Sequence, residues 1–270
     1  SDRATTARLI AYVTMVMVVA PMAAPNLGAA LDARFDWRAI FAFCALFGAL
    51  VLATLAFGLF ETRPEAMRGA TYSEVARRSA GLVRNPAFMR YAGLSAFASA
   101  CFFIFLGASP HLVIEAMGRS PQEFGLWYIV LGVGYSLGNL TVARCTHLIG
   151  TERMMALGSV LLLIGVAVMI GLALVPVMHP AAVFLPAVFF TYGNGLVLPH
   201  SMAAAIQTDR NAAGAASGLV GCSQMLAGAI LSYVVSKMPG ETPLAMALMM
   251  FASGLVSMAM LPRWRKPPAG

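Results

Sequence analysis

The chain has 270 residues, of which 60% are hydrophobic and 11% charged, and its formal net charge is +7. Soluble domains carry roughly a quarter charged residues, so this composition excludes an ordinary water-soluble fold. A positive charge can indicate a nucleic-acid partner, but here the Arg residues lie in short connections between hydrophobic segments, which argues against one.

Long hydrophobic segments with few charges recur along the whole chain. A helix that crosses a bilayer needs about 20 apolar residues, and eight segments reach that length. In chain order they cover about residues 9–31, 39–60, 91–114, 124–143, 154–176, 180–206, 212–236 and 242–262. The sequence therefore predicts an all-α fold, a polytopic transmembrane helical bundle embedded in a lipid bilayer.

One connection between these segments is long and polar. It covers residues 61–90 and contains six Arg, so it divides the chain into a first part with two crossings (1–60), a linker (61–90), a six-helix part (91–262) and a tail (263–270). Alternating crossings place 14 of the 18 Lys and Arg on one side of the membrane. By the positive-inside rule that side is the cytoplasm, so we expect both termini of this chain and the linker to be cytoplasmic.

The residues that usually carry metal or covalent chemistry form no pattern here. Cysteines are found only at Cys44, Cys101, Cys145 and Cys222, with no CxxC pair and no His at ligand spacing, so we interpret them as small core residues. Neither GxSxG nor HExxH occurs. No motif therefore supports an intramembrane hydrolase with Ser217 as nucleophile and His200 as base. We predict that the protein is not an enzyme and binds no metal and no cofactor.

Proline and glycine residues in the hydrophobic segments carry a family resemblance. APMAAPNLGAA, Ala20 to Ala30, places Pro21, Pro25 and Gly28 on one helix. It resembles the antiporter motif in helix five of drug and proton antiporters of the major facilitator superfamily. FDWRAIF (35–41) and the ETRP that ends the second segment resemble the entry and exit of helix six in the Bcr/CflA drug-efflux branch. GNGLVLPHSMAAAI (193–206) and AAGAASGLVG (212–221) resemble helices ten and eleven. Helix packing alone would also explain each motif taken singly.

This resemblance implies a partial major facilitator fold. The eight segments would correspond to helices five to twelve, and helices one to four, with the acidic residue expected to couple protons, would be absent from this chain. The intact parent would be a proton-coupled multidrug efflux protein of the bacterial inner membrane. It would be a monomer driven by the proton gradient, with a small-molecule substrate and protons as partners.

We expect this chain alone to be inactive, because rocking transport needs both halves. The alternative is a non-transporting truncated protein, or a subunit that needs a separate N-terminal piece.

Candidate substrate-binding residues lie in the segments that the resemblance assigns to the cavity, helices seven and ten. A mixture of aromatic rings and small polar groups suits an amphipathic drug, and the candidates are Ser95, Ser99, Phe102, Phe103, Tyr192 and Asn194. As the alternative, the serines bond carbonyls of their own helix and the rings face lipid. Asn194 is flanked by glycines, so close helix packing is its alternative role.

Small residues at helical spacing predict close helix contacts and gating interfaces. GxxxG pairs occur at Gly134 and Gly138 and again at Gly214 and Gly218. Gln224 follows the second pair along one stripe, so we predict that it is a buried hydrogen-bonding residue. His200 is a candidate for proton linkage or a satisfied polar residue near the cytoplasmic end.

Overall fold

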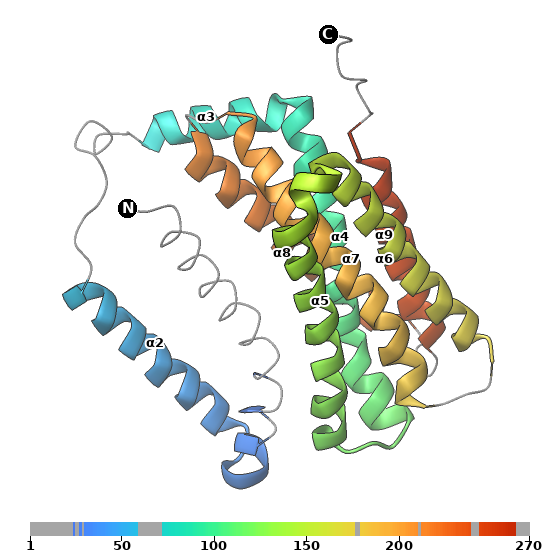
Figure 1. The fold of residues 1–270 in the computed structure, drawn as a ribbon. Helices are drawn as coiled ribbons and strands as arrows, with labels where there is room; N and C mark the ends of the chain where they lie inside the picture. Colours follow the sequence, from blue (N-terminus) through green and yellow to red (C-terminus); the bar gives the residue numbers. More distant parts are fainter. Residues whose placement is uncertain are drawn as a thin grey trace. The chain divides into compact units, whose positions relative to one another are not determined.

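The computed structural model describes residues 24, 27, 28, 30–58, 72–175, 179–209, 212–238 and 243–262. All the regular structure in these ranges is helical (Figure 1). The chain forms two compact units, Ser1–Ala76 and Arg77–Gly270, which are described separately below. The predicted all-α class is confirmed, and the first predicted segment, 9–31, lies mostly outside the described residues.

The first unit contains one long apolar helix, α2 (Arg38–Gly58), after a helical stretch at 30–35. It matches the predicted second segment, and none of its residues is buried. Phe41, Phe47 and Leu50 are among its exposed side chains. A helix that is hydrophobic on all sides suits a surrounding of hydrocarbon or other helices rather than water.

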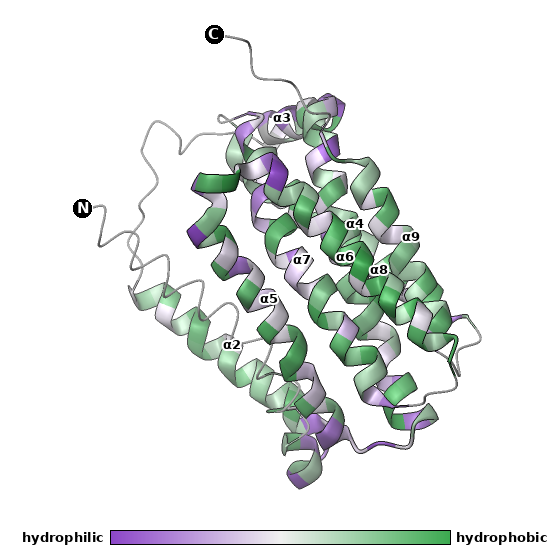
Figure 2. Cartoon of the chain, turned by 45° about the vertical axis from the view of Figure 1, so that its right-hand side comes forward, coloured by the Kyte–Doolittle hydropathy of each residue, from purple (hydrophilic) through white to green (hydrophobic). Residues whose placement is uncertain are grey.

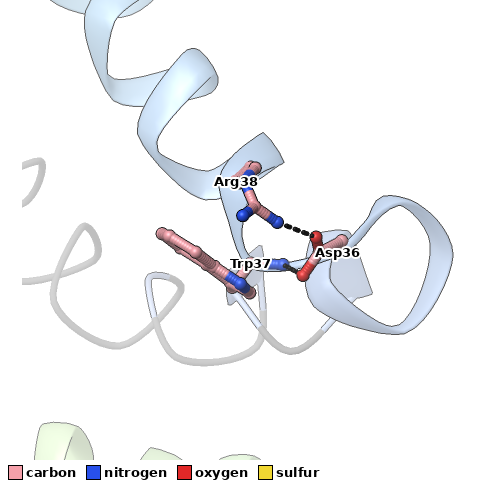
Figure 3. Close-up of polar contacts among 3 residues, drawn as sticks. All are labelled: Asp36, Trp37 and Arg38. Carbon is pink, nitrogen blue, oxygen red and sulfur yellow. Dashed lines mark hydrogen bonds and ion pairs between the residues drawn. The ribbon is translucent and has the colours of Figure 1, made fainter.

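A tight turn centred on Asp36 joins residues 30–35 to α2 (Figure 3). Asp36 has a φ of 83°, the left-handed region that Asp tolerates better than most residues. Its carboxylate accepts hydrogen bonds from the Trp37 backbone N–H at 2.6 Å and from Arg38 Nη1 at 2.9 Å. The Arg38 guanidinium also lies 4.5 Å from the centre of the Trp37 ring. Three consecutive residues thus fix the turn, with a charge pair and a cation–π contact.

Helix α3 (Tyr72–Arg84) lies within the predicted linker, and from Arg77 onwards it belongs to the second unit. It is much more polar than the helices that follow it. Leu82 is nevertheless buried in a small hydrophobic cluster with Phe88, Ala212 and Val220. This cluster attaches α3 to one end of the helical bundle, across which it runs in Figure 1.

The second unit is a bundle of long apolar helices. Their bounds are α4 (Pro86–Pro110), the short π-helix η2 (His111–Ala116), α5 (Pro121–Ile149), α6 (Thr151–Ala173), α7 (Pro180–Gln207), α8 (Ala213–Ser236) and α9 (Pro243–Ala259). Hydrophobic residues cover most of their length in Figure 2, with hydrophilic ones chiefly near the ends. In the described part of the chain, six helices are long and apolar enough to cross a membrane: α2, α4 with η2, and α5 to α8; α9 is shorter.

Three of the bundle helices begin with a capping residue followed by proline. Asn85 accepts hydrogen bonds from the N–H groups of Ala87 and Phe88, Ser120 accepts one from Glu123, and His179 accepts one from Ala181. Proline at the first helical position suits a helix start because its missing N–H would have no partner there. These caps set α4 and α5 a few residues earlier than the predicted starts at 91 and 124.

Helix α7 is the centre of the bundle, packed between α5 and α6. On the α5 side, a Cβ added at Gly138 would collide with the Tyr192 carbonyl oxygen, and one at Gly195 would lie 2.6 Å from the Tyr135 carbonyl oxygen. On the α6 side, a Cβ at Gly158 would lie 2.7 Å from the Gly193 carbonyl oxygen. Glycines on both flanks therefore let α7 approach its two neighbours at backbone distance.

Candidate functional site

The two serines predicted to bind substrate lie on buried parts of α4. Ser95 is fully buried and accepts a hydrogen bond of 2.6 Å from Gln224 Nε2 on α8. Ser99 is also buried, and its hydroxyl donates to the Ala96 carbonyl of its own helix at 3.0 Å. Both hydroxyls thus have partners within the bundle, and substrate contact by either stays a prediction.

The two phenylalanines beside them are half-buried on α4. The rings of Phe102 and Phe103 meet edge to face, with their centres 5.9 Å apart. The Phe103 ring packs directly on Gly228 of α8, where a Cβ would collide with it. Phe103 therefore contributes to the contact between α4 and α8 in this structure.

The two predicted residues of α7 are two positions apart and therefore lie on different sides of this helix. The Tyr192 hydroxyl forms a 2.8 Å hydrogen bond with Thr141 Oγ1 of α5. Asn194, two residues on, is 3% exposed, and its Oδ1 is buried with no hydrogen-bond partner in the described part of the chain. The two side chains are therefore not gathered into one site here, and Asn194 keeps an unused acceptor.

The two predicted glycine pairs differ in what surrounds them. Gly134 and Gly138 face α7 so closely that a side chain at either would collide with it. A Cβ at Gly214 or Gly218 of α8 would meet no atom within 4 Å among the described residues. The same sequence pattern thus marks a formed helix contact in α5 and an open face in α8.

The antiporter motif lies in the first unit. Pro21 and Pro25 are outside the described residues. Gly28 is helical and half-buried, and a Cβ there would meet no described atom within 4 Å. The motif's role in antiport stays a prediction.

The cysteines do not behave alike. Cys101 is buried, and its thiol lies 3.3 Å from the Met250 carbonyl oxygen of α9. Cys44 and Cys222 are exposed, so interpreting all four as core residues was wrong. The reason is that a helix facing lipid keeps apolar residues on its outside as well as its inside.

One polar contact that the sequence did not indicate connects α7 to α5. His200 is buried, its Nδ1 lies 2.7 Å from the Leu196 carbonyl oxygen and its Nε2 lies 3.0 Å from Thr146 Oγ1. Because a carbonyl only accepts, Nδ1 carries a proton and donates it. Thr146 is 54 residues away in the chain, so no local spacing could have linked the two.

A double-mutant cycle tests the link between α4 and α8. We expect Ser95→Ala and Gln224→Leu to be coupled by about 0.6 kcal/mol, the average for hydrogen bonds between membrane helices, and by no more than about 1.7 kcal/mol. The free energy of unfolding of the purified chain in detergent micelles would be measured for both single variants and the double variant. Ser223→Ala is the control for Gln224→Leu, because Ser223 donates to Val220 of its own helix. Additive effects of Ser95→Ala and Gln224→Leu would contradict the link.

The bundle of long apolar helices defines a multi-pass membrane protein. Comparison with known proteins places it more closely: a sequence profile of the Major Facilitator Superfamily matches residues 1–232. The chain belongs to this superfamily.

Individual relatives cover most of this chain at modest identity. An uncharacterized MFS-type transporter, YdgK of Bacillus subtilis, is 25% identical over 253 residues, which are 92% of this chain and 62% of YdgK. A bicyclomycin resistance protein homolog of Haemophilus influenzae is 25% identical over 252 residues, or 93% of this chain and 63% of that protein. Multidrug transporter MdfA of Edwardsiella piscicida is 31% identical over 157 residues, or 56% of this chain and 37% of MdfA. The chain thus spans less than two thirds of the length of these relatives.

Proposed function

We propose that the protein to which this chain belongs moves small molecules across a membrane, and that it exports drugs. The observation that carries this proposal is the superfamily match over residues 1–232, together with relatives named for multidrug transport and bicyclomycin resistance. The apolar helices of the bundle provide the scaffold that transport across a bilayer requires.

Export would be driven by exchange for protons, without a cofactor and without covalent chemistry. Asp and Glu are absent from the interiors of the predicted segments, so the carboxylate that usually carries protons in such exchangers would come from elsewhere in the protein. Substrate, protons and lipid would be the partners of a monomer. The inner membrane of a bacterium, with both termini of this chain in the cytoplasm, is the location we propose, on the basis of the Lys and Arg distribution.

A drug-resistance assay tests the proposed function. The gene product in full, as the genome encodes it, would be expressed in a drug-sensitive bacterium, and the inhibitory concentrations of bicyclomycin and a panel of other antibiotics would be measured. We expect at least one to rise above that of cells with an unrelated membrane protein at equal expression. In inverted membrane vesicles with an acid interior, the same drug should release protons.

Two outcomes bear on different parts of the proposal. Resistance without drug-dependent proton release would refute proton exchange and leave export standing. Unchanged inhibitory concentrations across the panel, with the protein present in the membrane, would refute drug export.

A further inference from the structure

A pocket of about 500 Å³ lies at one end of the bundle, and none of the residues predicted to bind substrate is among those that line it. It is formed where α4 and α6 begin and where α5 and α7 end. Its floor includes the buried residues Met155 and His200, and its mouth includes the exposed residues Thr151 and Glu152. The volume is within the range of about 300–1,000 Å³ that small-molecule sites occupy.

The polar groups of this pocket favour a positively charged ligand. Glu152, in the first turn of α6, is the charged side chain among the described residues that line it, and no Lys or Arg is among them. Tyr91 of α4 lines the same pocket as Glu152. A carboxylate and an aromatic ring together are groups that hold ammonium ions in proteins.

Four further polar residues line the pocket, Thr146, Thr151, His200 and Gln207, and the ring nitrogens of His200 are engaged within the protein. His200 Nδ1 donates to the Leu196 carbonyl, and Nε2 is paired with the Thr146 hydroxyl. His200 therefore has no free ring nitrogen for a ligand. Glu152 is the charged group of the lining among the described residues, and Met155 and Pro199 provide apolar surface for the body of the ligand.

We propose that this pocket binds an organic ammonium group, held by the Glu152 carboxylate and the Tyr91 ring, with the apolar body of the ligand against Met155 and Pro199. The same ammonium chemistry is present in a free organic amine and in the ethanolamine headgroup of a lipid. The site is independent of the proposed drug export, because it needs only four helices of the second unit, α4 to α7.

Calorimetry on the purified chain tests this site. In micelles of an uncharged sugar detergent, we expect benzylammonium to bind saturably and benzyl alcohol, of the same size but neutral, to bind about tenfold more weakly or not at all. Glu152→Gln should lower the affinity for benzylammonium to that for the alcohol. Because Glu152 is exposed at the mouth, this variant should keep the melting temperature of the parent chain.

Glu123→Gln is the matched control. Glu123 is likewise in the first turn of its helix, α5, but at the opposite end of that helix from the pocket, so the affinity for benzylammonium should not change. Equal affinities for the amine and the alcohol would overturn the proposal. So would unchanged binding by Glu152→Gln, or an equal loss in both glutamine variants.

Added lipid separates the two sources of the ammonium group. If the headgroup occupies the pocket, phosphatidylethanolamine added to the micelles should weaken benzylammonium binding to the parent chain, and phosphatidylglycerol should not. If both lipids leave the affinity unchanged, the site takes a free amine.

Discussion

Gly138→Ala should destabilise the bundle, whereas Gly218→Ala should leave it as stable as the parent chain or slightly more so. At Gly138 the new methyl group would collide with the Tyr192 carbonyl oxygen and lie 3.0 Å from the Gly195 Cα, and these backbone atoms cannot move without displacing α7. Overpacking of this kind costs about 1–3 kcal/mol. At Gly218 the methyl group enters open space among the described residues, and Ala favours the helix by up to about 1 kcal/mol.

Thermal unfolding in detergent micelles measures this difference. Both glycines belong to a GxxxG pair on a long apolar helix, so the two variants share the same chemical change and a similar sequence pattern. If the two variants had equal melting temperatures, the difference between the two glycines would be contradicted: Gly138 would not be in closer backbone contact than Gly218.

Asn194→Leu should raise the stability of the chain and abolish drug export by the full protein. Asn194 is 3% exposed, and its Oδ1 has no hydrogen-bond partner among the described residues. An unsatisfied buried polar atom costs about 1–3 kcal/mol, and Leu has the same branched arrangement of heavy atoms without a polar one. If Asn194 contacts the substrate, as predicted from its position in the sequence, the same replacement removes a recognition group. Stability and activity then move in opposite directions.

Asn139→Leu on α5 is the control for this second prediction. Asn139 Nδ2 donates to the Tyr135 carbonyl oxygen of its own helix at 2.9 Å, so removing the amide should bring no comparable gain in stability. Melting temperature and inhibitory drug concentration would be measured for both variants. A lower melting temperature for Asn194→Leu would contradict an unsatisfied Oδ1, and unchanged resistance would contradict substrate contact.

Hydropathy was sufficient to find the long apolar helices that the structure describes, because a bilayer demands long apolar segments whatever their neighbours are. The predicted segment 180–206 matches α7, Pro180–Gln207, almost residue for residue. The predictions differ more where a charge stands near the start of a helix. Arg90 and Glu123 interrupt the apolar pattern, so the predicted segments begin just after them. The helices themselves begin a few residues earlier, directly after the capping residues Asn85 and Ser120. The third predicted segment, 91–114, ends within the π-helix η2, which hydropathy cannot distinguish from an α-helix.

Packing partners could not be predicted, because they depend on helix rotations that one chain's pattern leaves open. Gln224 was expected to form a buried hydrogen bond and Ser95 to face a substrate, yet the structure pairs them with each other. The two GxxxG pairs look alike in the sequence, but only the pair in α5 meets a described neighbour. The pocket near Glu152 draws on four helices, so no single stretch of sequence contains it.

The contacts between α4 and α9 set an order for biosynthesis. Ser253 and Ser257 donate to the carbonyl oxygens of Phe97 and Leu94 at 2.8 and 2.9 Å, and the Cys101 thiol donates to the Met250 carbonyl. These partners are 149 to 163 residues apart. Because the chain is synthesised at about 5–20 residues per second, α4 leaves the ribosome roughly 7–30 s before α9, the helix that covers this face of α4. During that interval α4 must be shielded by lipid or by the insertion machinery, and a ribosome stalled before α9 would leave it uncovered.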